Sequence, residues 1–192
     1  MTSILVRCDA SLSIGSGHVI RCRTLARVFK NKGAEVLFIC RSQPGDLIAL
    51  LEEEFRVIVL PNQPLLSCSD LSGRELHNAW LGCSQHTDAD HCLGALYEAG
   101  INSVDWIVVD HYGLDSSWEA RLISGLTKGI NKPKLLVIDD LADRCHNADL
   151  LLDQNYFGNL TKGRYRELLP KTCCQLLGPH FALLSKEYAH LH

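Results

Sequence analysis

The sequence predicts an α/β fold with a mainly parallel sheet and helices on both of its faces. Short apolar runs alternate with segments whose apolar residues recur every three or four positions, as expected when strands and amphipathic helices follow one another. The strand-like runs are almost continuously apolar, such as "WIVVD" at 106–110, which is typical of strands buried on both sides. Glycine and proline are spread along the 192 residues and no repeat is present, so we expect one domain spanning 1–192.

The first half of the chain is predicted to supply three strands and two helices. "ILVRC" at 4–8 is a short apolar strand, and a turn-rich loop follows at 9–17. From His18 onward apolar residues recur at helical spacing until Gly33 supplies the stop. The other elements of this half are a strand at 35–41, a helix at 44–55 that begins with proline, and a strand at 56–60. Residues 61–78 are polar and are expected to be irregular.

The second half continues the alternation. A helix is predicted at 86–99, with Thr87 or Asp88 as its N-cap, and another at 116–126 with a serine cap. The predicted strands lie at 106–110, 134–140, 148–155 and 173–178. Because parallel strands are joined by right-handed crossovers, this order favours a doubly wound, Rossmann-like sheet.

Composition narrows the function classes. A net charge of −3 disfavours a nucleic-acid-binding protein, which needs a basic face. No run of eighteen apolar residues is present, so we expect no membrane partner, and the N-terminus lacks the features of a signal peptide. These features predict a cytoplasmic protein.

The nine cysteines are predicted to be buried, reduced thiols. Their number is odd and no C-x-x-C pair occurs, which disfavours a disulfide framework and a zinc ribbon. The stretch "DADHC" at 88–92 only superficially resembles a metal cluster, because it has no second half. We therefore expect neither a metal nor a cofactor.

Polar and ionisable residues follow the predicted strands and so gather at one edge of the sheet. "DASLSIGSGH" follows the first strand, "DHYGLD" the fourth, "DDLADR" the fifth and "DQNY" the sixth. Ligands of doubly wound sheets bind outside the carboxyl ends of the strands. We therefore expect the functional site at this edge.

The glycine-rich loop ahead of the first helix is a candidate anion-binding site. Backbone N–H groups and the positive end of the helix dipole favour a phosphate there. Gly15 and Gly17 are not followed by a third glycine, and the second strand ends in Cys40 and Arg41 rather than an acidic residue, so the nicotinamide fingerprint is absent. The same helix field disfavours the charged form of His18, which suits a general base; capping or packing are the alternative roles.

Further candidates follow the fourth and fifth strands. Tyr112 can donate a hydrogen bond to a substrate oxygen, whereas His111 either meets substrate or supports a neighbouring loop. Asp139 and Asp140 form a carboxylate pair, or one of them bonds a turn while the other caps the next segment.

Five stretches together resemble the N-terminal half of the UDP-sugar hydrolases of the pseudaminic acid pathway. They run in the order of that family from residue 3 to residue 188: "RCDASLSIGSGHVIRCRTLA", "WLGCSQHTDAD", "VVDHYGLDSSWE", "VIDDLADRCHNADLLLDQNY" and "LLGPHFALLSKEY". The resemblance implies one half of a two-domain glycosyltransferase type B fold. It also implies metal-free hydrolysis of a UDP-linked 2,4-diacetamido-2,4,6-trideoxy sugar at the anomeric carbon, with inversion.

Site residues are carried over by the same resemblance. His18 of the G-x-G-H loop would be the general base, and Tyr112 of the D-H-Y motif would line the site. The loop would face the diphosphate and the sugar. The full set of candidate substrate-binding residues is Ile14, Gly15, Ser16, Gly17, Arg21, Asp110 and His111. Since UDP is already a good leaving group, one base suffices, unlike the acid and base of ordinary inverting glycosidases.

The resemblance departs from the family near the end of the chain. "LLSKEY" replaces an arginine-proline pattern, and the family's C-terminal nucleotide-binding domain would begin after residue 192. We therefore expect an N-terminal catalytic domain that binds UDP poorly and hydrolyses little by itself. A glycosyltransferase domain of the same architecture and a non-catalytic domain that binds a ligand or a partner are the alternatives.

Overall fold

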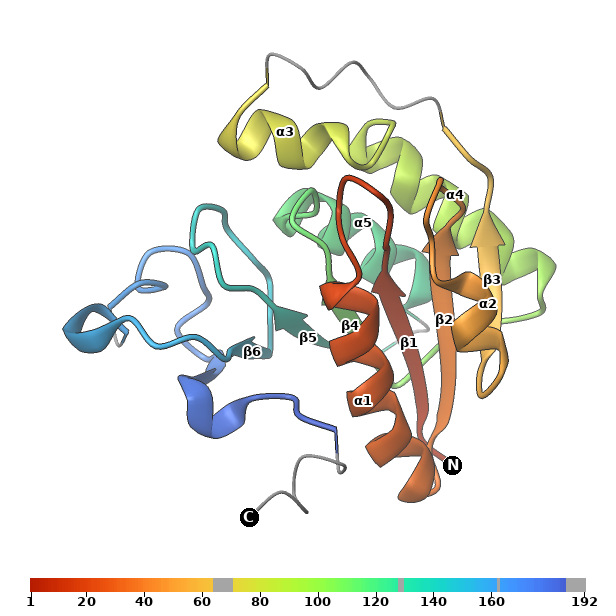
Figure 1. Ribbon diagram of the computed structural model, residues 1–192. Helices are drawn as coiled ribbons and strands as arrows, with labels where there is room; N and C mark the ends of the chain where they lie inside the picture. The colour runs from red at the N-terminus through yellow and green to blue at the C-terminus, as the bar shows by residue number, and fades with distance from the viewer. Residues whose placement is uncertain (64–70, 128–129, 162, 186–192) are drawn as a thin grey trace.

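The computed structural model describes residues 1–63, 71–127, 130–161 and 163–185. These residues form a parallel sheet of seven strands in the order β3-β2-β1-β4-β5-β6-β7 (Figure 1). The strands are β1 (Ser3–Cys8), β2 (Glu35–Arg41), β3 (Arg56–Leu60), β4 (Trp106–Asp110), β5 (Lys134–Ile138), β6 (Leu150–Asp153) and β7 (Cys174–Leu177). The helices are α1 (Gly17–Asn31), α2 (Ile48–Glu52), α3 (Gly73–Ala79), α4 (Gln85–Glu98) and α5 (Ser116–Leu126), with short 3₁₀ turns at Gly158–Leu160 and Pro179–Phe181.

Alternate residues of each strand face opposite layers of helices. Leu5 and Ile107 belong to the core beneath α4 and α5, where Trp118 is fully buried. Ile4 and Val108 belong to the core on the α1 and α2 side. Side chains of successive strand residues point to opposite faces of the sheet. A sheet covered by helices on both faces therefore needs apolar residues at consecutive strand positions. The predicted α/β fold with helices on both faces is confirmed.

The strand order reverses between β1 and β4. The chain winds outward from β1 to β2 and β3 in one direction, then returns to β4 and continues to β7 in the other. Cys8 at the end of β1 pairs in register with Asp110 at the end of β4. In an open α/β sheet the loops diverge at such a reversal and leave a crevice between them.

Several predicted boundaries need correction. The helix expected at 44–55 is limited to α2, because Pro44 and Gly45 form a turn in which Gly45 has a φ of 81°. The strands expected at 134–140, 148–155 and 173–178 are shorter, as β5, β6 and β7. Residues 61–78 were expected to be irregular, but they include most of α3.

Two predicted caps were also wrong. Ser84 caps α4, where its hydroxyl accepts the Thr87 N–H at 3.1 Å, while Asp88 turns into the core. Asp115 caps α5 rather than a serine, and its carboxylate accepts the Ser117 N–H at 2.9 Å. The capping residue lies three positions before Thr87 in α4 and one position before Ser116 in α5.

The cysteine prediction holds for only part of the set. Cys8, Cys22, Cys40 and Cys92 are buried, Cys83 and Cys173 are half-buried, Cys145 and Cys174 are exposed, and all of these are free thiols. Cys68 lies outside the described residues. Strands β1 and β2 and the inner faces of α1 and α4 hold the buried thiols, whereas the thiols in connections and in the edge strand β7 were misjudged.

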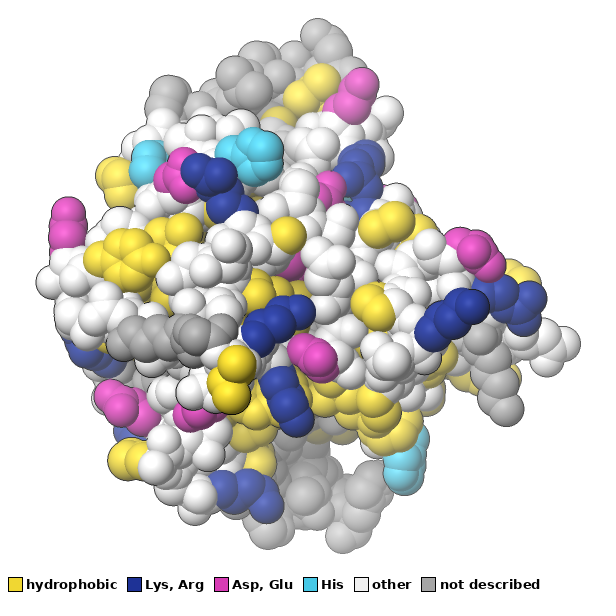
Figure 2. Space-filling view, turned by 180° about the vertical axis from the view of Figure 1, so that it is seen from behind, with side chains coloured by type: hydrophobic (Ala, Val, Ile, Leu, Met, Phe, Trp, Pro, Cys, Tyr) yellow, Lys and Arg dark blue, Asp and Glu magenta, His cyan; other side chains and the backbone are white. Residues whose placement is uncertain are grey.

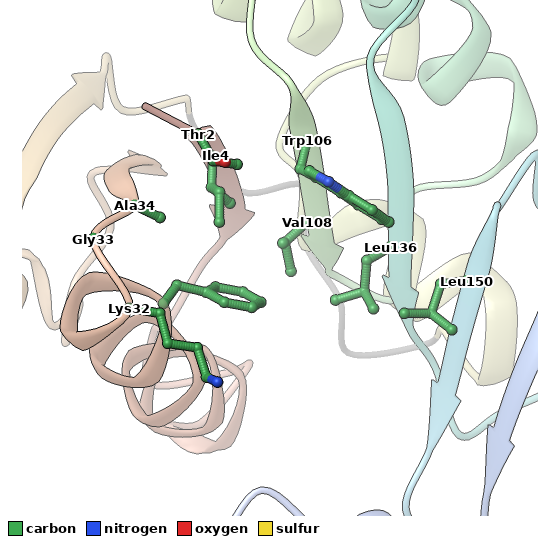
Figure 3. A pocket seen from close by; sticks show the side chains of 10 residues that line it. Thr2, Ile4, Lys32, Gly33, Ala34, Trp106, Val108, Leu136 and Leu150 are labelled. Carbon is green, nitrogen blue, oxygen red and sulfur yellow. The ribbon is translucent and has the colours of Figure 1, made fainter.

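The surface shows two further features away from the carboxyl edge of the sheet. An apolar groove of about 370 Å³ lies at the amino-terminal half of the strands, where Ile4, Trp106, Leu136 and Leu150 face the end of α1 (Figure 3). On the opposite side of the molecule basic and acidic side chains are interspersed (Figure 2). Among the described residues, no helix is both long and apolar enough to cross a bilayer.

Candidate functional site

The candidate site lies at the carboxyl edge of the sheet, where the strand order reverses. The loop between β1 and α1 enters it from one side, and the end of β4 enters it from the other (Figure 1). Three of the candidates that the sequence suggested, His18, Arg21 and Asp110, meet here by direct side-chain contact. Ionisable groups therefore gather where the strand order reverses.

The glycine-rich loop is held in shape by Ser11. Its hydroxyl accepts the N–H groups of Ser13 at 3.2 Å and Ile14 at 3.0 Å, and its carbonyl accepts the Gly15 N–H at 2.8 Å. Gly15 has a φ of 81°, a conformation that glycine adopts without strain. Gly17 has an ordinary φ, and a Cβ added there would meet nothing within 4 Å, so neither backbone nor packing demands glycine at this position.

The first turn of α1 is open to solvent. Gly15, Ser16 and Gly17 are exposed and Ile14 is half-buried. Ser16 is the N-cap residue, but its side chain makes no capping hydrogen bond. Backbone N–H groups at an uncapped N-terminus of a fifteen-residue helix can bind an anion.

His18 forms a buried pair with Asp110. Nδ1 of His18 lies 2.5 Å from Oδ1 of Asp110, and the two side chains are 7% and 0% exposed. A carboxylate oxygen at this distance requires a hydrogen on Nδ1, so Nε2 is the ring nitrogen that carries a lone pair whenever the ring is uncharged. Nε2 makes no hydrogen bond to the described residues.

Arg21 completes this cluster one helical turn after His18. Its Nε and Nη2 donate to the two oxygens of Asp110 at 2.5 and 2.6 Å. Burial opposes ionisation of Asp110, but the His18 ring and the Arg21 guanidinium outweigh it and hold the pKa of this carboxyl at about 2. The carboxylate is therefore charged at neutral pH and fixes both the orientation and the tautomer of His18.

Asp110 and the helix dipole act on the charge of the His18 ring in opposite directions. The dipole of α1 disfavours a positive charge on His18, whereas Asp110 stabilises the imidazolium that proton transfer would create. His18 thus has the environment of a base oriented by a carboxylate.

Tyr112 packs against His18 from the loop after β4. The two rings meet edge to face, with centroids 4.5 Å apart and planes inclined by 81°. The Tyr112 hydroxyl donates to Oδ1 of Asp140 at 2.5 Å. Burial, and next the Asp140 carboxylate, raise the pKa of Tyr112, so the phenol is neutral.

Asp139 and Asp140 do not form a carboxylate pair. Asp139 is fully buried, and its Oδ2 accepts the Ala142 N–H at 3.0 Å and the Tyr165 hydroxyl at 3.1 Å. The structure places Asp140 in the site instead, where Asn155 Nδ2 donates to its Oδ2 at 3.0 Å. Asp140 and Asn155 were not among the predicted binding or catalytic residues, although both stand at the ends of predicted strands, at the carboxyl edge of the sheet.

His111 lies beneath the site rather than in it. Its ring is 2% exposed, and Nδ1 accepts the Gly113 N–H at 3.0 Å, which turns Nε2 toward Asp9 at 3.5 Å. Burial lowers the pKa of His111 to about 4. This geometry matches the loop-supporting role that the sequence left open, and it leaves no ring nitrogen facing a ligand.

A buried ionic network supports the same loops. Arg7 donates to Asp9 at 2.5 Å and to Asp88 at 3.0 Å, and Arg41 donates to Asp88 at 2.9 Å. All of these side chains are at most 1% exposed. Asp88 is therefore held by two guanidinium groups instead of being available to a metal.

No group of three or more His, Cys, Asp or Glu side chains in the described ranges is arranged to hold a metal ion. The ionisable residues at the carboxyl edge are engaged mainly in ion pairs between acids and arginines, such as Arg21 with Asp110.

Helix α3 adds residues that the sequence did not predict. His77 and Trp80 stack at 4.7 Å, and their ring centroids lie 5.3 and 6.2 Å from that of Tyr112. Figure 1 shows α3 above the carboxyl ends of the central strands. Gly113 permits this close approach, because a Cβ there would lie 2.6 Å from the His77 carbonyl oxygen. The helix was missed because it is short and follows a proline-rich polar stretch.

Comparison with known proteins supports the resemblance found in the motifs. The UDP-2,4-diacetamido-2,4,6-trideoxy-β-L-altropyranose hydrolase of Campylobacter jejuni subsp. jejuni serotype O:2 is 26% identical to this chain over 185 residues. The match covers 96% of this chain and 53% of the relative, so the chain spans about half the length of that hydrolase. No protein-family model matches the chain.

A solved structure supports the fold independently of sequence. The MurG protein of Acinetobacter baumannii superposes with a TM-score of 0.51 at 8% identity, over 92% of this chain and 45% of MurG. At this identity the similarity concerns the fold alone. It agrees with a Rossmann-like domain that matches slightly less than half of MurG.

Proposed function

We propose that this chain is the base-bearing N-terminal domain of a nucleotide-sugar hydrolase. The substrate is a UDP-linked 2,4-diacetamido-2,4,6-trideoxy sugar of pseudaminic acid biosynthesis, and the products are UDP and the free sugar with inverted anomeric configuration. The observation that carries the proposal is the His18–Asp110 pair at the switch point of the sheet, in which the carboxylate engages Nδ1 and leaves Nε2 as the ring nitrogen that can take a proton. The similarity along 96% of the chain to a hydrolase of this specificity supports the choice of substrate.

In the proposed reaction, water attacks the anomeric carbon from the face opposite to UDP. Nε2 of His18 takes one proton from the water as the new C–O bond forms. The bond between the anomeric carbon and the UDP oxygen breaks, and its electron pair moves onto the β-phosphate of UDP. Asp110 stabilises the imidazolium until the proton returns to solvent.

The other candidate residues fit this reaction as binding or supporting groups. The stretch Ile14 to Gly17, exposed from Gly15 onward, and the open amides of α1 suit the negative charge of the diphosphate. Arg21 fixes Asp110 and so acts on the base indirectly. A second domain that holds the nucleotide, weak activity of this chain alone and a cytoplasmic location belong to the same proposal.

The test uses the protein at its native length with the UDP-linked altropyranose sugar in ¹⁸O-labelled water. Attack at carbon places ¹⁸O in the sugar and none in UDP, and NMR identifies the anomer formed first. His18→Asn should lower kcat by at least 100-fold while UDP affinity stays within about two-fold. His86→Asn, which replaces an exposed histidine of α4, serves as the matched control and should retain wild-type turnover.

Each alternative function has its own outcome in this assay. Sugar release only when a hydroxyl acceptor is added would identify a glycosyltransferase. Normal turnover of His18→Asn would contradict the assignment of the base. Binding of the sugar nucleotide without any turnover would favour a non-catalytic domain.

A further inference from the structure

Asp140 connects three side chains of the candidate site. Its Oδ1 accepts the Tyr112 hydroxyl at 2.5 Å, and its Oδ2 accepts Asn155 Nδ2 at 3.0 Å. Nη1 of Arg21 lies 3.5 Å from the same Oδ2. These partners come from the loop after β4, the loop after β6 and α1, so one carboxylate links three segments that are distant in sequence.

The direction of the Tyr112 hydrogen bond follows from its partners. A phenol has one hydrogen, and a carboxylate can only accept. Donors from Asn155 and Arg21 face Oδ2 of Asp140, and Oδ1 accepts the Tyr112 hydroxyl. The Tyr112 hydrogen therefore points to Asp140, and the lone pairs that remain on the phenol oxygen can only accept.

The sequence suggested that Tyr112 donates a hydrogen bond to a substrate oxygen. The geometry instead makes the Tyr112 oxygen an acceptor toward a ligand. The His18 ring, with its own acceptor at Nε2, packs 4.5 Å from the Tyr112 ring. An oxygen that can only accept suits a ligand that carries a donor hydrogen, and water is the smallest such ligand.

We propose that Asp140 is a positioning residue that fixes the Tyr112 oxygen as a hydrogen-bond acceptor for the attacking water. This inference rests on the proposed hydrolysis. One water hydrogen is transferred to Nε2, and the other is donated to the Tyr112 oxygen and stays on the product. The water lone pair is thereby directed at the anomeric carbon.

The kinetic test compares Asp140→Leu, Tyr112→Phe and the double variant at native length. Each single variant should lower kcat about 10- to 100-fold with KM within about three-fold, because orientation and not binding is lost. The double variant should be no more than about three-fold slower than Tyr112→Phe, since Asp140 acts through the phenol. Asp140→Asn keeps a carbonyl acceptor and should recover part of kcat.

The control is Asp143→Asn, an exposed carboxylate of the same loop, and it should retain wild-type kcat. Multiplicative losses in the double variant, or a KM that rises together with the fall in kcat, would overturn the positioning role of Asp140.

A second readout needs no turnover. In ¹³C-tyrosine-labelled wild-type chain, the Tyr112 hydroxyl hydrogen should give a downfield, slowly exchanging NMR signal that disappears in Tyr112→Phe. The signal should also be lost in Asp140→Leu while the rest of the spectrum stays folded. Persistence of the signal in Asp140→Leu refutes the hydrogen bond itself. If the signal disappears in Asp140→Leu but the wild-type protein shows no hydrolase activity, the hydrogen bond is supported and the proposed function is contradicted.

Discussion

Replacement of Asp88 by asparagine tests the buried ionic network most directly. Asp88 lies on α4 with no solvent exposure, and its carboxylate accepts from Nε and Nη2 of Arg7 at 3.3 and 3.0 Å and from Nη2 of Arg41 at 2.9 Å. Asparagine is nearly the same size, so the change removes charge while leaving the packing almost unaltered. Its amide group also turns donor hydrogens toward guanidinium groups that need acceptors.

The magnitude follows from the titration of Asp88 and from the burial of its partners. Burial opposes ionisation, but Arg7 and then Arg41 lower the pKa of Asp88 from 3.8 to about 2. A difference of nearly two pH units contributes about 2 kcal/mol to the free energy of unfolding at neutral pH. Since the variant also leaves two buried guanidinium groups short of an acceptor, we expect a total loss of about 3 to 5 kcal/mol.

Urea denaturation at pH 7 measures this loss, and Asp90→Asn is the matched control. Asp90 lies on the same helix, and its partner Arg121 is equally exposed, with 51% and 45% of the two side chains accessible. Water screens such a pair, so the control should unfold close to the wild-type midpoint.

The pH dependence supplies a second check with a definite sign. Because the folded-state pKa of Asp88 is depressed, its contribution is complete above pH 3.8 and is lost as the pH falls toward 2. The difference between wild type and Asp88→Asn should therefore shrink between pH 5 and pH 2. Equal destabilisation by Asp88→Asn and Asp90→Asn, or a difference that does not change with pH, would refute the reasoning.

Three further predictions concern backbone and thiol positions. Gly113→Ala places a Cβ 2.6 Å from a carbonyl oxygen of α3, and it should lower the free energy of unfolding by about 1 to 3 kcal/mol. Gly94→Ala, at an exposed helix position with nothing within 4 Å, should instead raise it by about 0.5 to 1 kcal/mol, and thermal unfolding separates the two signs. Ala142→Gly should stabilise the fold by about 0.5 to 1 kcal/mol because the φ of 53° strains alanine; a lowered melting temperature would contradict this. Cys145 and Cys174 should react with a thiol reagent in the native state, whereas the buried thiols react only after unfolding, as a time course with and without urea would show.

The position of the site was predictable from the sequence because it depends on connectivity. Strands that alternate with helices run parallel, so the residues after each strand must meet at one edge. His18, Arg21 and Asp110 meet there in the structure, as the order of elements requires. Their distances were not predictable, because Asp110 is ninety-two positions from His18 and only the register of β1 and β4 brings them together.

Other features depend on local geometry that carries no periodic signal. Helix α3 has seven residues, too few to display a hydrophobic period, so His77 and Trp80 were not recognised as neighbours of Tyr112. The directions in which Asp139 and Asp140 point depend on where β5 ends, and strand ends are poorly defined by propensity.

By itself, the sequence determined the fold class, the edge of the sheet at which the candidate residues meet and the position of His18 at the start of α1. These features follow from apolar periodicity and chain order, which are local properties. Only the tertiary structure decided that Asp110 orients His18, that His111 lies beneath the site and that Asp140 takes the hydrogen of Tyr112. Hydrogen bonds form over about 3 Å, and contacts at that range between distant residues exist only once the strands are in register.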